Sequence, residues 1–191
     1  APPAVHGGAP PTFTDPNASG DWRPIGPARI ATPLAGVGVA NGRVNAIAVS
    51  PADERVILMG ADGGGIWRSE DGGASFRLAT ETDGGVPAIE FSPVDPAVAY
   101  AMADGEMTIG TPGSLYDGAF LRSTDGGKTW SRMHLPYRGS SFPGTPDPRI
   151  RPDARERDRV LITTFGAVWS SPDGGSSWSQ VLECAFCDTA Y

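Results

Sequence analysis

The residues with the clearest potential for chemistry are aspartates that precede paired glycines. Three of them lie in near-copies of one nine-residue stretch: RSEDGGASF at 68–76, RSTDGGKTW at 122–130 and SSPDGGSSW at 170–178. A carboxylate placed in this way can accept hydrogen bonds from backbone N–H groups two or three residues further along the chain. The glycines permit positive φ without a steric cost. We therefore expect Asp71, Asp125 and Asp173 to hold turns rather than to act as catalytic acids or bases.

The same stretch supplies side chains that can complete the turn and start a strand. In the second copy, the hydroxyl groups of Ser123 and Thr129 can close the turn. Trp130 follows directly and is expected to begin the next strand, with its ring buried between sheets. The stretch therefore predicts a hairpin with a defined register.

Each of the three turns belongs to a longer repeat of the sequence. The rest of each repeat must supply the strands that the turn connects. The three aspartates are 125 − 71 = 54 and 173 − 125 = 48 residues apart. In the first repeat, apolar and mostly β-branched segments predict strands at about 44–49, 55–60, 65–69 and 75–79. A period of about 40–50 residues with four strands per unit is typical of the blades of a β-propeller. We place the three blades at about 43–80, 86–136 and 146–182.

The composition favours an all-β fold. The chain of 191 residues contains 26 glycines and 19 prolines, which leave little room for long helices and suit short strands joined by turns. Residues 1–20 are rich in proline, glycine and alanine and show no period, so we expect an extended N-terminal arm. The propeller blades are expected to occupy the remainder, 21–191.

The charge of the chain and its lack of ligand-type residues limit the kinds of partner and cofactor that it can bind. The formal net charge is 15 − 22 = −7, and acidic residues interrupt the most basic stretch, 149–159, so we expect no nucleic-acid partner. No apolar run approaches the roughly 20 residues of a membrane-spanning helix. The two histidines, His6 and His134, are isolated, and no phosphate-binding loop is present. We therefore expect no metal site and no cofactor.

Two features indicate an exported protein. The chain begins APPAVHGGAPP without an initiator methionine, which suggests a mature protein after signal-peptide removal, although a trimmed chain would look the same. Cys184 and Cys187 are expected to form a small disulfide in an oxidising compartment. Two free thiols or a redox-active C-x-x-C are the alternatives. We expect a periplasmic or extracellular location.

The repeated stretch resembles the Asp-box, S-x-D-x-G-x-[ST]-[WF], of BNR-repeat propellers. The matching residues are Ser69, Asp71, Gly73, Ser75 and Phe76, then Ser123, Asp125, Gly127, Thr129 and Trp130, then Ser171, Asp173, Gly175, Ser177 and Trp178. The opening DWRPIGP at 21–27 is also similar to the first blade of sortilin-like and BNR-glycosidase-like exported proteins. The resemblance implies a β-propeller fold, but it does not imply one function, because the fold hosts many.

The number of repeats is low for a closed propeller. Propellers have about 4–8 blades, whereas three repeats are evident here. Three blades leave an open sheet face at each end, and open apolar faces associate or aggregate. Either the chain is a fragment of a longer protein, or a partner or a second copy of the chain covers these faces.

Two hydrolase families share the Asp-box. Sialidases also carry an Arg-Ile-Pro motif, which ARIATP at 28–33 lacks, and no Tyr–Glu nucleophile pair is evident. Two-propeller glycosidases that cleave xyloglucan place a catalytic aspartate in T-D-x-G-G-x-[YW]-R, and ADGGGIWR at 61–68 is similar, with Ala61 in place of the threonine. The resemblance implies that Asp62 is a candidate catalytic carboxylate, whose partner would have to lie about 6.5–9.5 Å away on a second propeller. We favour a turn residue between the second and third strands as the role of Asp62, and the catalytic role is the alternative.

Aromatic residues outside the strands are candidates for contacts with a protein partner. Tyr116 lies in an insertion of the second repeat, 104–118, and Tyr137 and Phe142 lie in the long loop 135–148. Loops that combine aromatic residues with arginine suit binding hot spots on proteins. We expect both segments to contact a partner.

These observations favour a non-catalytic, exported scaffold or interaction subunit, although they do not decide whether the chain is an enzyme. One branch of the family resembles photosystem assembly and stability factors, which implies a peripheral subunit on the periplasmic face of a membrane complex, such as a photosynthetic reaction centre. The alternative is a fragment of a BNR-type glycoside hydrolase that acts on a polysaccharide.

Overall fold

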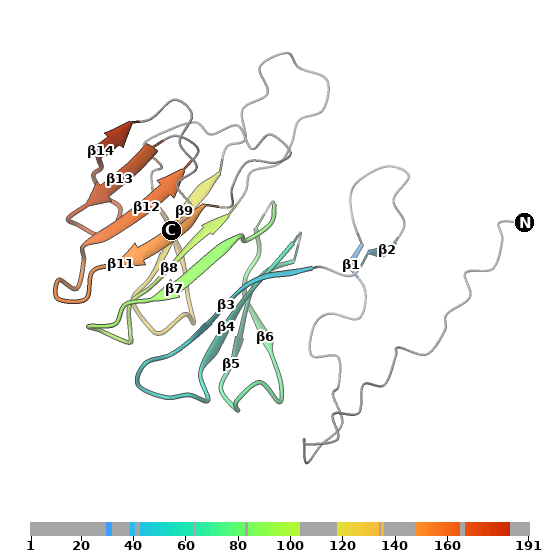
Figure 1. Cartoon of the computed structure of the whole chain (residues 1–191). Helices are drawn as coiled ribbons and strands as arrows, with labels where there is room; N and C mark the ends of the chain where they lie inside the picture. Colours follow the sequence, from blue (N-terminus) through green and yellow to red (C-terminus); the bar gives the residue numbers. More distant parts are fainter. Residues whose placement is uncertain are drawn as a thin grey trace, which may run out of the picture.

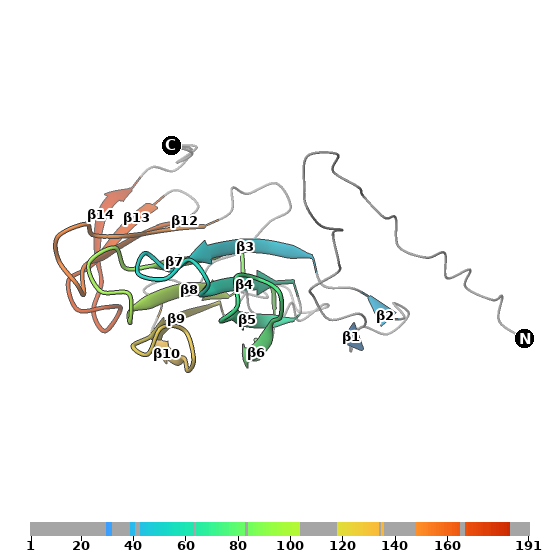
Figure 2. The same cartoon turned by 90° about the horizontal axis from the view of Figure 1, so that it is seen from below.

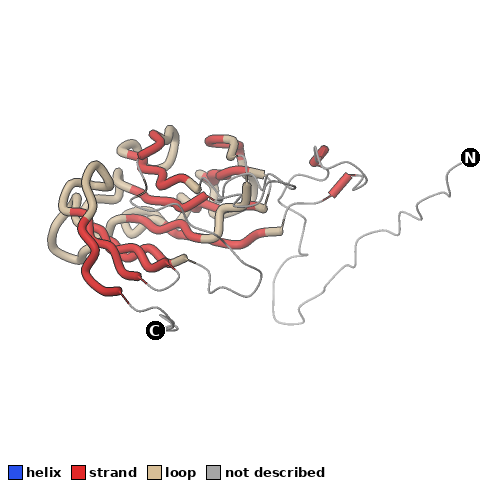
Figure 3. Tube along the Cα trace, turned by 90° about the horizontal axis from the view of Figure 1, so that it is seen from above, coloured by secondary structure: helices blue, strands red, loops and turns tan. Residues whose placement is uncertain are grey.

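The computed structural model describes residues 30–31, 39–40, 43–62, 64–82, 84–103, 118–133, 135, 148–164 and 167–183. All regular elements in these ranges are β-strands, as Figure 3 shows. The predicted N-terminal arm, 1–20, lies outside the described residues.

Twelve of the strands form three four-stranded antiparallel sheets, which we call blades one, two and three (Figure 1). Each sheet is a meander, because its strands are paired in the order in which they follow along the chain. Blade one contains β3 (Val44–Val49), β4 (Ile57–Ala61), β5 (Gly65–Ser69) and β6 (Arg77–Thr80). Blade two contains β7 (Ala88–Phe91), β8 (Ala99–Ala103), β9 (Ala119–Ser123) and β10 (Ser131–Met133). Blade three contains β11 (Arg149–Pro152), β12 (Val160–Thr164), β13 (Ala167–Ser171) and β14 (Ser179–Glu183).

A further pair, β1 (Ile30–Ala31) and β2 (Val39–Ala40), precedes blade one and forms its own two-stranded sheet.

The three blades follow one another face to face. Their first strands β3, β7 and β11 lie side by side at one edge, and the fourth strands lie at the opposite edge (Figures 1 and 2). This radial order of four-stranded meanders is the arrangement of propeller blades. The prediction of an all-β propeller with three visible blades is confirmed.

The strands of blade one follow the predicted ranges with two shifts. The second strand begins at Ile57 rather than at 55, because the N–H group of Val56 still donates to the carbonyl of Asp53 within the preceding turn, at 2.9 Å. The fourth strand begins at Arg77 rather than at 75, because the N–H group of Ser75 is bound to the carboxylate of Asp71. In blade two, Trp130 likewise lies just before its strand, which begins at Ser131.

The contact between blades one and two is apolar. It is built from alternate residues of facing strands, as expected for sheets that bury one face. From blade one it takes Leu58 and Ile66, both fully buried, and from blade two it takes Ile89, Phe91 and Leu121, which are nearly so. Alanines of β8 and β9 fill the space between these larger side chains, so the two sheets pack closely.

The contact between blades two and three is centred on aromatic rings. Tyr100 and Phe120 are fully buried and stack with ring centroids 5.6 Å apart. The ring of Trp178 meets Phe120 edge-on at 5.1 Å. Ile150 and Ile162 of blade three close the cluster. The contact between blades two and three therefore contains more aromatic side chains than the contact between blades one and two.

Replacing Phe120 by alanine is expected to lower the free energy of unfolding by about 3–5 kcal/mol, because the substitution leaves a cavity between two rigid sheets. Urea unfolding followed by tryptophan fluorescence measures this change. The control is Val94→Ala, at a position 43% exposed, which should stay within about 0.5 kcal/mol of the native chain. A loss for Phe120→Ala as small as that of the control would mean that blades two and three are not joined through this ring.

Candidate functional site

The three Asp-box turns share one network of hydrogen bonds. The serine hydroxyl donates to the aspartate carboxylate at 2.8 Å in each copy: Ser69 to Asp71, Ser123 to Asp125 and Ser171 to Asp173. The same serine oxygen accepts the N–H group of the second glycine at 2.8–2.9 Å. The carboxylate then accepts both the N–H group and the hydroxyl group of the residue four positions on, at 2.7–2.9 Å and 2.6 Å.

The acceptor geometry confirms one predicted donor and adds another. The N–H group of Lys128, three residues after Asp125, donates to its carboxylate at 3.0 Å, as expected. In all three turns the N–H group four residues after the aspartate donates as well, in Ser75, Thr129 and Ser177. Both glycines adopt positive φ, 71–75° for the first and 85–98° for the second, which lengthens the turn and brings this further residue to the carboxylate.

These hydrogen bonds hold the carboxylates in their charged form, because a donated hydrogen bond favours the ionised acid. The pKa of Asp71 and of Asp173 is lowered to about 2, chiefly by the hydroxyl and N–H groups of Ser75 and Ser177. Burial raises the pKa of Asp125, but the hydrogen bonds from Thr129 and Ser123 outweigh it and lower the pKa to about 2. All three carboxylates are therefore fully engaged in the turns as anions at neutral pH.

Replacing Asp125 by asparagine should make the stability less dependent on pH in acid. The folded state lowers this pKa from 3.8 to about 2, so the carboxylate stabilises the fold above its ordinary pKa and loses this effect as the pH falls towards 2. In urea titrations, the gap between the native chain and Asp125→Asn should be largest at pH 6 and should shrink steadily between pH 5 and pH 2. A gap that stays constant over this range would contradict the assignment.

Asp62→Asn is the matched control for this titration. Its carboxylate is 53% exposed and lies 4.0 Å from the guanidinium of Arg43. Because it closes no Asp-box, its replacement should leave the urea midpoint close to that of the native chain throughout the pH range.

The Asp-box turns also join neighbouring blades. A Cβ atom added to the second glycine of box two, Gly127, would lie 2.5 Å from Leu58 of blade one. A Cβ atom on Gly175 of box three would lie 2.6 Å from Phe120 of blade two. Glycine is thus required both by its positive φ and by the close approach of the preceding blade.

An arginine in the third strand, just before the Asp-box turn, adds a polar contact between each blade and the next. Arg68 of blade one donates to the carbonyl of Gly126 at 2.8 Å. Arg122, at the equivalent position of blade two, is ion-paired with Asp158 of blade three. Both arginines stand in the repeated stretch, but sequence reasoning missed their role, because their partners lie 58 and 36 residues away along the chain.

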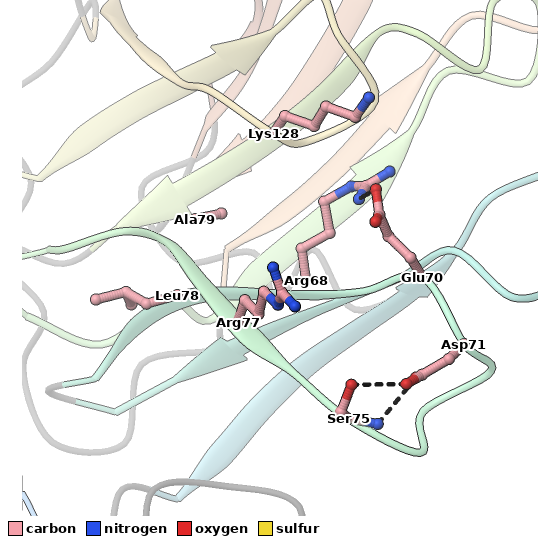
Figure 4. Close-up of a pocket in the computed structure, with 8 residues that line it drawn as sticks. All are labelled: Arg68, Glu70, Asp71, Ser75, Arg77, Leu78, Ala79 and Lys128. Carbon is pink, nitrogen blue, oxygen red and sulfur yellow. Dashed lines mark hydrogen bonds and ion pairs between the residues drawn. The ribbon is translucent and has the colours of Figure 1, made fainter.

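A recess lies beside the first Asp-box, at residues 68–76 (Figure 4). It has a volume of about 380 Å³ and lies between β6, the first Asp-box and the loop of the second Asp-box. Its lining consists of Arg68, Glu70, Asp71, Ser75, Arg77, Leu78, Ala79 and Lys128. Three consecutive lining residues belong to β6, the outermost strand of blade one, which is paired on one side only within the described part of the chain.

The lining of the recess carries a net positive charge. Arg68 is largely buried and is ion-paired with Glu70, whose pKa this arginine lowers. Asp71 is occupied by its own turn, as Figure 4 shows. Arg77 and Lys128 have no carboxylate within ion-pair distance among the described residues. The lining therefore holds 3 − 2 = +1 charge on a chain of net charge −7. An anionic group fits this recess.

Asp62 lies at the opposite end of blade one from the recess. It follows β4, whereas the box turn joins β5 to β6, and successive turns of an antiparallel meander lie at opposite ends of the sheet. The N–H group of Asp62 donates to the carbonyl of Arg43 at 2.8 Å. The indole of Trp67 donates to the carbonyl of Gly64 at 2.6 Å, which closes the same turn. Asp62 is thus an exposed turn residue, and its carboxylate lies 4.0 Å from the guanidinium of Arg43.

Several predicted site residues lie outside the described residues. These are Tyr116, Tyr137, Phe142, Cys184 and Cys187. Within the described ranges, no group of three histidine, cysteine or acidic residues is arranged to hold a metal ion. No helix in these ranges has the length and apolar character needed to cross a bilayer.

Comparison with known proteins places the chain in a family. The family model described as "Photosynthesis system II assembly factor YCF48" matches residues 53–187, which is more than half of the chain. The chain belongs to this family. The resemblance to BNR-type propellers is thereby confirmed.

Two groups of curated proteins are similar to this YCF48-family chain. A xyloglucanase of Paenibacillus sp. is 32% identical over 161 residues, covering 75% of this chain and 15% of the enzyme. A photosystem II assembly lipoprotein Ycf48 of Synechococcus sp. (strain CC9902) is 30% identical over 124 residues, covering 65% of this chain and 30% of the lipoprotein. The chain thus spans less than a third of the length of either relative.

Solved structures agree on the fold. The GH74 xyloglucanase from Xanthomonas campestris aligns with a TM-score of 0.56 at 22% identity, over 73% of this chain and 21% of that enzyme. A YCF48 bound to a D1 peptide aligns with a TM-score of 0.51 at 16% identity, over 80% of this chain and 43% of that protein. At these identities the likeness concerns the propeller fold, which hydrolases and assembly factors share.

Proposed function

We propose that this chain is a non-catalytic, exported scaffold that binds a protein partner. In its specific form, the proposal is a peripheral subunit on the periplasmic face of a membrane complex such as a photosynthetic reaction centre. Membership of the YCF48 family supports this role, as does the similarity to a Ycf48 that is a photosystem II assembly lipoprotein. The binding of a D1 peptide by a YCF48 of similar fold gives a precedent for a protein ligand.

The recess beside box one is the single observation that carries the proposal. Its floor is the free edge of β6, whose backbone groups can pair with an extended peptide. Arg77 and Lys128 stand beside this edge without carboxylate partners, so they can bind acidic side chains or a terminal carboxylate. Leu78, which is 43% exposed, offers an apolar contact in the same lining. The ligand best matched to these features is an extended acidic segment of a protein.

Reversing the charges of Arg77 and Lys128 should weaken binding of an acidic peptide. The double variant Arg77→Glu/Lys128→Glu changes the charge of the recess by four units and should weaken binding of a synthetic D1 peptide by at least tenfold. Isothermal titration calorimetry at low and at moderate salt measures this loss, and affinity for the native chain should fall with salt. The same variant, tagged in the source organism, should no longer co-purify with its membrane complex.

Arg155→Glu is the control for charge. Arg155 is an exposed arginine in the β11–β12 turn of blade three, remote from the recess. It should bind the peptide like the native chain. Equal weakening by both variants would indicate a non-specific effect of charge, and unchanged binding by the double variant would refute the recess as the site.

The second candidate function is a portion of a glycoside hydrolase. It is favoured by the xyloglucanases among the relatives and by the position of Asp62 in a free, exposed turn. Inverting hydrolysis needs a second carboxylate about 6.5–9.5 Å from the first. Under this proposal, a facing propeller of a longer protein supplies that group.

Asp62→Asn separates the two functions, because Asp62 and the recess lie at opposite ends of blade one. If the chain is part of a hydrolase, this substitution in the longest natural protein should reduce release of reducing sugars from xyloglucan by several orders of magnitude and leave peptide binding unchanged. Under the scaffold proposal, the native protein releases no sugar and Asp62→Asn has no effect on co-purification.

A further inference from the structure

Two largely buried arginines at the junctions between blades are neutralised in different ways. Arg68 of blade one, whose side chain is 11% exposed, is ion-paired with Glu70, whose side chain is 67% exposed. Arg122, at the equivalent position of blade two and 18% exposed, is ion-paired with Asp158, which is 37% exposed and lies in the turn of the next blade. The acid that neutralises Arg68 is therefore the one that faces solvent more openly.

The next blade offers Arg68 no acid at the place that serves Arg122. The carbonyl of Asp158 accepts the N–H group of Gly174, the first glycine of its box, and the carbonyl of Ala97 accepts that of Gly126 in the same way. Ala97 thus occupies in blade two the place that Asp158 occupies in blade three. Because an alanine cannot compensate a charge, Arg68 takes its ion-pair partner from its own blade.

The two acids also differ in how firmly they are held. Asp158 pairs with Arg157 as well, at 3.5 Å, whereas the described residues show an ion pair of Glu70 with Arg68 alone. If Glu70 leaves, its carboxylate is readily hydrated, because the side chain is already mostly exposed. A carboxylate from a ligand can then take its place, so the exchange does not leave the buried charge of Arg68 unpaired, which would be costly.

The Asp-box itself does not require an acid at this position. The residue between the serine and the aspartate is Glu70 in blade one, Thr124 in blade two and Pro172 in blade three. The hydrogen bonds that close the three turns are nevertheless the same. The repeated framework therefore does not account for Glu70.

Glu70 lies among the cations of the recess (Figure 4). The hydrogen bond from Arg68 lowers the pKa of Glu70 most strongly, and the charges of Lys128 and Arg77 lower it further. Glu70 is thus an anion at neutral pH, and its charge acts on the same three side chains that an acidic ligand approaches. A carboxylate that enters the recess meets one that is already there.

We propose that Glu70 is an internal competitor that occupies the place of a ligand carboxylate on Arg68. The inference rests on the proposed function, in which the recess binds an acidic segment of a protein. It adds Arg68 to the two cations Arg77 and Lys128 and assigns to Glu70 the role of limiting affinity. The ligand reaches Arg68 only by displacing Glu70, and the tethered acid returns when the ligand leaves. The native recess thus binds an acidic segment less tightly than its three cations alone would.

Replacing Glu70 by glutamine should therefore strengthen binding. Glutamine keeps the size of the side chain and removes its charge, so Arg68 becomes available to the ligand. The affinity for a capped synthetic peptide of alternating threonine and glutamate should rise by about threefold to fivefold, the effect of one exposed pair of charges. Isothermal titration calorimetry at low salt measures this gain, and circular dichroism checks that the variant keeps its β-sheet signal.

Glu54→Gln is the matched control, because it makes the same change of net charge in blade one. Glu54 is exposed in the turn between β3 and β4 and lies outside the lining of the recess, so this variant should bind the peptide like the native chain. An equal gain from both variants would overturn the inference in favour of a general effect of charge. Unchanged or weaker binding by Glu70→Gln would also overturn it, since Glu70 would then serve only to hold Arg68 in place.

A titration with inorganic sulfate tests the competition without a peptide. In NMR spectra of the arginine side chains, the Nε–H signal of Arg68 should shift in Glu70→Gln at sulfate concentrations that leave the native chain unchanged. Equal shifts in both chains would refute the competitor even if the peptide binds. If neither chain binds the peptide, the proposed function fails, and the sulfate titration still decides whether Glu70 competes for Arg68.

Discussion

Each blade of this protein depends on a turn that a single carboxylate closes. The aspartate of the box accepts hydrogen bonds from the serine before it and from the residue four positions after it, and the positive φ of two glycines makes this reach possible. The turn holds the third strand against the fourth, and it also brings the second glycine against the preceding blade. One local motif thus sets both the hairpin within a blade and the distance between blades.

The Asp-box turns use their carboxylates to hold the fold, so the proposed binding sites lie on other residues of blade one. The box carboxylates accept hydrogen bonds within the turns. The sites that we propose use other groups, namely the cations at the edge of β6 at one end of blade one and Asp62 at the other end. The two proposed sites lie at opposite ends of blade one, so a test of one leaves the other intact.

The features that depend on neighbours in the sequence could be predicted. The Asp-box, the four strands of each unit and the all-β class follow from short-range patterns of serine, aspartate, glycine and apolar residues. The recess and the Arg68–Gly126 and Arg122–Asp158 contacts could not be predicted, because they join residues 36–58 positions apart whose approach is set by blade packing. The four-residue reach of the carboxylate was also missed, since the turn residues admit more than one donor until the φ values of both glycines are known.

The repeated joint also bears on how such a protein can arise. A unit that carries a glycine turn on one face and a matching apolar pocket on the other is complementary to a copy of itself. Tandem duplication of one unit then lengthens the array without requiring a new contact to evolve. Later changes, such as the aromatic pair Tyr100 and Phe120 where blade one has Leu58 and Ile66, distinguish one junction from the next. The side chains that each turn covers therefore differ between junctions, and these differences determine which blade packs next to which.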